Sequence, residues 1–395
     1  MLLMGRCASQ RETDILCRMS NGRLQTSTAS SASQERALRV LHVDTERGWR
    51  GGERQLLWLA QGLAKRGDSS VIAARAHEPL ATRAREAGFP VLALRPLFAA
   101  DPFAAWQLRT VIERQGIDIV HAHTSHAVSL AAVAMLGLHV PLVIARRVDF
   151  PLRSGRGTRW KYGRAREIIA VSRAVADVVA TAELGVPVTV IHDATDVART
   201  AAPADATMLA SLGVPAGAPI VVQVAQLVPH KDPLTFVRAI AAAHKHVPAL
   251  HALLVGDGPL RGDVEREVAE QGLSGVLHVL GYRTDADALL AAADVVSLSS
   301  REEGMGSVLL DAFVFGRPVA ATRAGGIPEI VHDRETGLLV SVGADDALGR
   351  AIALLLTDHA LANRLGTTAR ASAQAFSIDA ITAKTRDVYL RVLGR

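Results

Sequence analysis

The sequence predicts an α/β protein with two doubly wound parallel sheets, one following the other along the chain. Short β-rich runs alternate with helix-length amphipathic segments from Ala37 onward, a pattern typical of parallel strands joined by crossover helices. The alternation stops once, in a segment with Pro, Ala, Asp and Gly at residues 196–218, and then resumes. A length of 395 residues also exceeds what one hydrophobic core usually supports, so more than one domain is expected.

The first predicted half covers residues 37–195. Its expected strands are Leu38–Val43, Ser70–Ala74, Val91–Leu94, Ile117–Val120, Leu142–Ala145, Glu167–Val171 and Val188–Ile191. Amphipathic helices are expected at Glu53–Lys65, Pro102–Gln115 and Arg173–Glu183. The apolar stretch Ala127–Leu138 is too short to span a membrane and indicates a buried helix. Strands of this kind form a parallel sheet with helices on both faces.

The second predicted half covers residues 219–375, after an interdomain linker at 196–218. Its expected strands are Ile220–Ala225, Ala249–Val255, Val276–Leu280, Val295–Leu298 and Pro318–Ala320. Its expected helices are Asp232–His246, Leu260–Gln271, Asp285–Ala292 and Ser307–Phe315. Ligands of such sheets lie at the carboxyl ends of the strands, so we expect the site in a cleft between the halves. The last part, 376–395, holds a helix at Ile378–Leu393 that is expected to cross back to the first half.

Composition limits the class of protein. No apolar run is long enough to cross a membrane, and aromatic residues make up only 4%, which disfavours nucleic-acid binding. The net charge of +5 permits anionic partners. The two cysteines, Cys7 and Cys17, precede the first strand, which favours a cytoplasmic protein, either free or peripheral on the inner face of the cytoplasmic membrane. Residues 1–36 are expected to be a disordered extension, with an organelle transit peptide as the alternative.

The segment Ser299–Val340 carries most of the candidate chemistry. A strand ends near Ser299, a loop with the sequence EGMG follows at 303–306, and a helix begins just after it. Glycines let backbone N–H groups approach a ligand, and a helix N-terminus favours a phosphate. Glu303 and Asp311 can accept hydrogen bonds from hydroxyls, so the segment suits a phosphate between two polyols, as in a nucleotide sugar. The alternative is a helix-capping loop with solvated acids.

This segment resembles the donor-site signature of glycosyltransferase family 4, whose members have the two-domain GT-B fold and mostly retain the configuration of the transferred sugar. The family pattern is Glu-Gly-Phe-Gly, a second acid, Gly-Pro-Val, Gly-Gly-Ile-Pro-Glu and Gly-Leu-Leu-Val. The matching residues are Glu303-Gly304-Met305-Gly306, Asp311, Gly316-Arg317-Pro318-Val319, Gly325-Gly326-Ile327-Pro328-Glu329 and Gly337-Leu338-Leu339-Val340. The resemblance extends from Leu38 to the C-terminus and is densest in the second half.

The resemblance implies a role for each part of the segment. Glu303 contacts the hydroxyls of the donor sugar and supports charge near the reacting carbon. The amides that contact the sugar and the diphosphate belong to Gly304, Met305, Gly306 and Ser307. The second acid, which usually holds the ribose, is here Asp311, one methylene shorter than the Glu of the family.

A second match is the sequence QVAQLVPHKD at 223–232, after the first strand of the second half. Lys231 is expected to neutralise the nucleoside diphosphate that leaves. The alternative, a solvated lysine at a helix start, is disfavoured because a cation there opposes the helix dipole. Gln226 stands where relatives commonly carry Arg, and losing that charge costs roughly 1.5–3 kcal/mol unless another arginine such as Arg54 compensates.

The first half contributes a glycine-rich loop and a histidine pair. Gly51 and Gly52 belong to the sequence GWRGGER at 48–54, which resembles the family's loop under the donor phosphates and the acceptor. His121 and His123 follow a strand and project to the same side. The resemblance places His123 near the primary hydroxyl of the sugar and the acceptor. The alternatives are a satisfied core histidine with helix capping, or a metal site, which lacks an acidic or cysteine partner.

No metal and no cofactor is predicted. The Gly256-Asp257-Gly258 motif has Arg261 where a dinucleotide fingerprint needs its third glycine. Asp285 and Asp287 match a metal-binding pattern of a different glycosyltransferase fold, but here they open a helix. The GT-B fold that the resemblance implies uses protein cations in place of an obligatory metal.

Basic residues crowd one segment of the first half. The set proposed as an acceptor or membrane surface is Arg146, Arg147, Arg153, Arg156, Arg159 and Lys161. Such a surface suits anionic lipid headgroups or a phosphorylated acceptor, since each basic residue near a membrane is worth about 1 kcal/mol. The alternative is a solvated loop and helix face.

These observations predict a GT-B glycosyltransferase that moves a sugar from a nucleotide-sugar donor to a hydroxyl acceptor with retention. The expected acceptor is a sugar or a lipid-linked molecule of the cell envelope, such as a glycan, a lipopolysaccharide or a glycolipid. Two alternatives stay open: a GT-B enzyme of another reaction type, and a non-catalytic protein that binds a nucleotide sugar or an anionic lipid.

Overall fold

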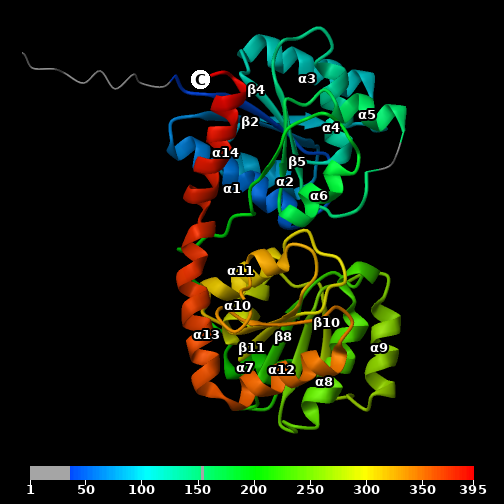
Figure 1. Ribbon diagram of the computed structural model, residues 1–395, viewed down its shortest axis with the longest axis vertical. Coiled ribbons are helices and arrows are strands. Elements are labelled where there is room, and N and C mark those ends of the chain that lie inside the picture. Colours follow the sequence, from blue (N-terminus) through cyan, green and yellow to red (C-terminus); the bar gives the residue numbers. More distant parts are fainter. Residues whose placement is uncertain (1–35, 153–154) are drawn as a thin grey trace, which may run out of the picture. The chain divides into compact units, whose positions relative to one another are not determined.

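The computed structural model describes residues 36–152 and 155–395, and these residues form two parallel sheets with helices on both faces (Figure 1). The predicted class, two doubly wound α/β halves, is therefore confirmed. The predicted extension at 1–36 lies outside the described residues except for Arg36, and Arg153 lies outside them as well.

The first sheet has the strand order β3-β2-β1-β4-β5-β6-β7, with every neighbouring pair parallel. Its strands are β1 Arg39–Val43, β2 Ser69–Arg75, β3 Val91–Leu94, β4 Ile119–Ala122, β5 Leu142–Arg146, β6 Glu167–Ala170 and β7 Val188–Val190. Its helices are α1 Gly51–Lys65, α2 Pro79–Glu86, α3 Pro102–Gln115, α4 Ser125–Ala134, α5 Arg156–Tyr162 and α6 Arg173–Ala180. The order reverses at β1 and β4, which is where doubly wound sheets bind their ligands.

The second sheet has the order β10-β9-β8-β11-β12-β13 and is also parallel. Its strands are β8 Ile220–Val224, β9 His251–Val255, β10 Leu277–Gly281, β11 Val295–Leu298, β12 Val319–Thr322 and β13 Leu338–Val340. Its helices are α7 Ala206–Ser211, α8 Pro233–His244, α9 Arg261–Glu270, α10 Ala286–Ala292, α11 Ser307–Val314, α12 Asp345–Thr357 and α13 His359–Ser372, with short 3-10 turns η1 Pro229–Lys231, η2 Ile327–Glu329 and η3 Ala373–Phe376.

Both sheets are buried on both faces, which explains why their strands are almost uniformly apolar. In β1, Leu41 and Val43 join the core under α3 and α4, while Leu38 and Val40 join the opposite core, against α1. These four side chains are fully buried, and burying each stabilises the fold by about 1.5–3 kcal/mol. The alternation fixes the register, because a slip of one residue would exchange the two faces.

The last helix, α14 Ile378–Val392, lies against the first half (Figure 1). Its Tyr389 is fully buried in the same core as Leu38 and Val40. Gly62 of α1 permits this approach, because a Cβ at that position would lie 2.1 Å from the hydroxyl oxygen of Thr382.

Two segments of the chain cross between the halves side by side, one around Thr195 and the other around Phe376 and Ser377. The amide of Thr195 donates to the carbonyl of Phe376 over 2.7 Å, and Thr195 forms a β-bridge with Ser377. The Gln55 side chain fixes the first segment by bonding both the amide and the carbonyl of Ala194, at 2.7 and 2.8 Å. The crossing segment around Ala194 is therefore held against α1.

The structure differs from the sequence prediction in three places. The predicted linker at 196–218 contains α7, whose first turn is capped by the Asp205 carboxylate on the amide of Met208. The helices α2 and α5 were not predicted. They have eight and seven residues, which is too short for a clear helical pattern of apolar residues. The sixth strand of the second sheet, β13, has only three residues and comes from the GLLV motif.

Among the described helices, none is both long and apolar enough to cross a membrane.

Candidate active site

A cavity of about 1040 Å³ lies between the two sheets, at the carboxyl ends of their strands. Its first-half wall follows β1, β4 and β5, and its second-half wall follows β8, β9, β10 and β11. The predicted residues that line it are Gly51, Gly52, His123, Arg146, Arg147, Gln226, Lys231, Glu303, Gly304, Met305, Gly306 and Ser307. A volume of this size fits a nucleotide sugar together with part of an acceptor.

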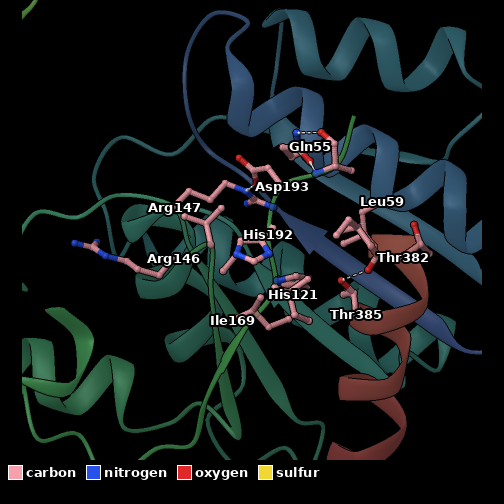
Figure 2. Close-up of a pocket in the computed structure, with 15 residues that line it drawn as sticks. Gln55, Leu59, His121, Arg146, Arg147, Ile169, His192, Asp193, Thr382 and Thr385 are labelled. Atoms are coloured by element: carbon pink, nitrogen blue, oxygen red, sulfur yellow. Dashed lines mark hydrogen bonds and ion pairs between the residues drawn. The ribbon is translucent and has the colours of Figure 1, made fainter. Parts of the chain in front are cut away.

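A second cavity lies deeper, beneath α14, and holds only about 30 Å³. Figure 2 shows its walls, with Arg147 and Asp193 on one side, His121 below them and Thr382 on α14. This volume is near that of a single water molecule. The large cleft is therefore the candidate ligand site, and the small cavity is part of its support.

The loop before α11 places Glu303 and the glycines in the cleft. Glu303 is buried, and its carboxylate accepts a hydrogen bond of 3.0 Å from the Ser300 hydroxyl. Gly306 has φ +81°, a conformation that glycine adopts without strain, and it forms the N-cap of α11. The free amides of the first turn of α11 therefore point away from the helix beside Glu303.

Lys231 forms an ion pair with Glu303. It ends the turn η1, and the Ser299 hydroxyl holds that turn by donating to the carbonyl of Asp232 over 2.9 Å. The two residues predicted to act on the donor thus come together from loops that are 72 residues apart in sequence. The pair gives the cleft a cation that can turn from Glu303 to a phosphate.

Asp311 is not among the residues that line the cleft, and its ribose contact stays a prediction. Its carboxylate is buried and pairs with two arginines, Arg54 of α1 at 2.9 Å and Arg199 of the crossing segment at 2.7 Å. Arg54 also lies outside the lining, where it is paired with Asp311. Asp311 therefore links α11 to the first half.

Several signature residues of the second half contact the first half. A Cβ at Gly304 would lie 2.1 Å from the carbonyl oxygen of Arg147, and one at Gly326 would lie 2.7 Å from the Cβ of Ser172. Glu329 accepts a bond of 2.8 Å from the amide of Arg173 at the N-terminus of α6, a favourable place for an acid. The glycines of these motifs therefore also permit close contact between the halves.

Arg147 organises the first-half wall. Its Nε donates to Asp193 over 3.0 Å, and its Nη1 donates to Nδ1 of His123 over 3.2 Å. A guanidinium can only donate, so a neutral His123 carries its proton on Nε2. That nitrogen lies 3.1 Å from Nδ1 of His42, which must then be the acceptor. Burial lowers the pKa of His42 to about 3 and that of His123 well below its usual value, so both rings are neutral at physiological pH.

His121 lies against His123, with ring centroids 4.1 Å apart, and Tyr389 of α14 holds it through a bond of 2.7 Å to Nδ1. The three imidazoles offer nitrogen atoms within 4.8 Å of one another, a spacing that suggests a metal site. The proton on Nε2 of His123 occupies the lone pair that a metal would need. The expected absence of a metal stays a prediction.

The predicted basic surface is divided in the structure. Arg146 is buried and donates to the carbonyl of Phe150, and Arg147 is committed to His123 and Asp193. Both line the cleft and are not part of a solvated face. Arg156 and Arg159 are exposed, while Lys161 binds hydroxyls of α4. The five described members therefore do not form one continuous solvated face, and their role as an acceptor or membrane surface stays a prediction.

Sequence analysis overlooked two acids of the cleft, Asp44 and Asp193. Asp44 is buried and Asp193 is half-buried, and desolvation raises the pKa of each. Asp44 follows β1 directly, so the rule that ligands bind at carboxyl ends of strands could have found it. Asp193 had no such signal, because it lies in an irregular crossing segment.

Two family models match consecutive stretches of the chain. The model described as Glycosyltransferase Family 4 matches residues 49–199, and the model described as Glycosyl transferases group 1 matches residues 205–372. The boundary between them coincides with the crossing segment between the halves.

Two curated proteins illustrate the likeness. The lipopolysaccharide core biosynthesis glycosyltransferase LpsE of Rhizobium meliloti is 33% identical over 186 residues, which are 47% of this chain and 52% of that protein. The 2-deoxystreptamine glucosyltransferase of Streptomyces kanamyceticus is 32% identical over 233 residues, 57% of this chain and 60% of that protein. The chain thus spans little more than half the length of these relatives.

Among solved structures, HepE of Anabaena in complex with UDP-glucose matches with a TM-score of 0.77 and 24% identity, covering 89% of this chain and 99% of that one. At this identity the likeness concerns the fold, which is GT-B. The two sheets, the motif spacing and the two family models agree, and the chain belongs to glycosyltransferase family 4.

Proposed function

We propose that the protein transfers a sugar from a nucleotide-sugar donor to a hydroxyl of an acceptor, with retention of configuration. The Lys231–Glu303 ion pair, located in the cleft beside the N-terminus of α11, is the observation that carries this proposal. It brings a cation, an acceptor for sugar hydroxyls and free backbone amides into one cavity. A nucleotide sugar needs all three.

The chemistry follows from these groups. The bond between the anomeric carbon and a diphosphate oxygen breaks, so negative charge develops on the leaving group. Lys231 and the first amides of α11 neutralise that charge, while Glu303 accepts hydrogen bonds from the sugar. These groups supply the positive charge that the diphosphate needs, so the proposal includes no obligatory metal or cofactor.

His123 belongs to the acceptor side of the proposal. Its ring is neutral and held by Arg147 and His42, so it has one fixed orientation in the cleft. A fixed ring positions the sugar and the acceptor without contributing charge. Closing the cleft brings this wall against the donor.

A panel of nucleotide sugars tests the proposal directly. Thermal shift identifies the donor, because a ligand that binds the folded state raises the melting temperature, and release of the free nucleoside diphosphate then measures transfer. We expect the wild type to turn over one donor and Glu303→Ala to lose at least about 100-fold in rate. Glu270→Ala, an exposed acid at the end of α9, is the matched control. Donor binding without turnover in the wild type would instead favour a non-catalytic binding protein.

We further propose a cytoplasmic protein that docks on an anionic membrane surface, where its acceptor is a lipid-linked molecule of the cell envelope. The name of LpsE agrees with that acceptor class. Large apolar side chains near the start of α3 support the idea, since Leu97 is 88%, Phe98 59%, Phe103 65% and Trp106 59% exposed. Such residues are typical of interfacial anchors.

The basic helix α5 lies on the same side of the first sheet, because α4 packs against both α3 and α5. Arg156 and Arg159 are exposed there, and Trp160 is 43% exposed. Aromatic and basic groups together suit the headgroup region of an anionic bilayer.

Sedimentation with vesicles tests this docking. Phosphatidylglycerol vesicles are expected to bind the wild type, phosphatidylcholine vesicles to bind it weakly, and Phe103→Ala/Trp106→Ala to lose at least about fivefold in affinity through the lost apolar contact. Leu354→Ala, an exposed leucine of the second half, is the control. Equal binding of the double variant and the wild type would contradict the proposed surface.

A further inference from the structure

Asp44 is an acid of the cleft that the proposed donor chemistry does not use. It is the first residue after β1, is 2% exposed and lines the large cavity. Val43 of β1 pairs with Ala122 of β4, so Asp44 and His123 follow this pair at neighbouring strand ends. The amide of His123 donates to the carbonyl of Val43 over 2.9 Å and keeps the two ends together.

Among the described residues, one oxygen of Asp44 has a hydrogen-bond partner and the other has none. Its Oδ1 accepts a bond of 2.8 Å from the amide of Glu46, two residues along the chain. Among the described residues, no cation forms an ion pair with Asp44, and Arg147, which faces it, is bound to Asp193. A buried carboxyl that keeps an oxygen without a partner beside a cavity is available to a ligand.

The surrounding charges set the proton affinity of Asp44. Burial raises the pKa of Asp44 to about 7, with help from the charges of Glu53 and Glu46 and against the hydrogen bond from the Glu46 amide and the charge of Arg147. His123, at the neighbouring strand end, is neutral and adds no charge. A general base is most effective when its pKa lies near the working pH.

We propose that Asp44 is the residue that receives the proton of the attacking acceptor hydroxyl, an inference that rests on the proposed function. The acceptor oxygen forms its bond to the anomeric carbon while the bond from that carbon to the diphosphate breaks with both electrons. The hydroxyl proton passes to the Asp44 carboxylate and later to water.

Asp44→Asn separates this role from a structural one. An asparagine keeps the side-chain oxygen that accepts from the amide of Glu46, so the turn after β1 is preserved. It removes the charge and the proton acceptor. Asp205→Asn is the matched control, since it makes the same replacement at a helix cap where Asn serves as well as Asp.

The experiment uses the full chain, the donor found in the panel and octyl glucoside as the hydroxyl probe. We expect Asp44→Asn to lower kcat at least 100-fold, with the Kd of the nucleoside diphosphate within twofold of the wild type. The wild-type rate should fall as the pH drops below about 7, where Asp44 becomes protonated, and the variant should lose this acid limb.

A variant that keeps kcat within threefold of the wild type, or keeps the acid limb, would overturn the assignment and leave the leaving diphosphate as the base. If the wild type itself transfers nothing with any donor, the proposed function fails, and this assignment fails with it. The two failures are therefore distinguished by the wild-type rate alone.

Discussion

The two walls of the cleft are built in different ways. The centre of the second-half wall is one continuous stretch, in which Glu303, the glycines and α11 follow each other. Lys231 joins them from the loop after β8, and the loops after β9 and β10 complete the wall. The first-half wall combines His123 and Arg147 from two strand ends with Tyr389 from the last helix. The first kind of site depends on backbone amides and needs a particular local sequence. The second depends on buried side chains and needs particular neighbours in space.

This difference predicts different responses to mutation. A change in the second-half wall should remove a ligand contact and leave the fold intact. A change in the first-half wall should alter the orientation of other side chains and the stability of the protein together. The experiments below test that distinction.

The largest effect is expected for Lys231→Ala. It removes the cation paired with Glu303, so the leaving diphosphate loses its counter-charge, and we expect kcat to fall about 10³-fold. Nucleoside diphosphate release measures it, with exposed Lys245→Ala as the control. A melting temperature close to that of the wild type is part of the prediction, and a large drop would contradict a pure ligand contact.

Asp44→Asn is expected to stabilise the fold. The folded protein raises the pKa of Asp44 from 3.8 to about 7, so the folded state holds a proton that the unfolded state has lost, and stability falls as the pH rises through this window. Each pKa unit is worth about 1.4 kcal/mol. We expect a gain of about 4 kcal/mol at pH 8 over the wild type, measured by urea unfolding.

That gain should shrink as the pH falls and vanish below about 3, where Asp44 is protonated in both states. A variant less stable than the wild type at pH 8 would show that Asp44 is structural. The first-half wall would then hold no strained ligand group.

Gly304→Ala tests the contact between the walls. The added methyl group would lie 2.1 Å from the carbonyl oxygen of Arg147, so the halves could not approach as closely. A displacement of about 1 Å from the reactive geometry costs about 10²-fold in rate, while diphosphate affinity should change little. Gly262→Ala is the control, because no atom lies within 4 Å of its added carbon. Equal losses in both variants would speak against the contact.

The smallest effect is expected for Tyr389→Phe. It removes the hydroxyl that bonds Nδ1 of His121, so His121 and the ring of His123 beside it lose a fixed orientation. We expect kcat to fall about tenfold with KM for the donor unchanged, and stability to fall by about 1 kcal/mol. Thr385→Val removes another buried hydroxyl of α14, and it should lower stability without lowering kcat.

The sequence predicts the second-half wall well because its chemistry is local. The glycines, Glu303 and the start of α11 follow from motif spacing alone. The two ion pairs of Asp311 could not be predicted, because its partners, Arg54 and Arg199, are 257 and 112 residues away and no local pattern indicates them. The same limit applies to Tyr389, which lies 268 residues from His121.

The fold followed from alternation, because both sheets are parallel and their strands are apolar throughout. The prediction missed elements where they were short. The three-residue β13 was overlooked, and α7 was hidden in the predicted linker. The basic cluster shows a different limit, because the sequence shows which residues are charged but not which are exposed. Arg146, for example, is buried.

The return of α14 to the first half affects how this chain is made. The core of the first half includes Tyr389, so residues 37–195 cannot complete their packing when they leave the ribosome. They must wait until the whole second half has been synthesised, with the α1 face uncovered in the meantime. Domains usually fold in the order of their synthesis, but here the first half to be made is the last to be finished.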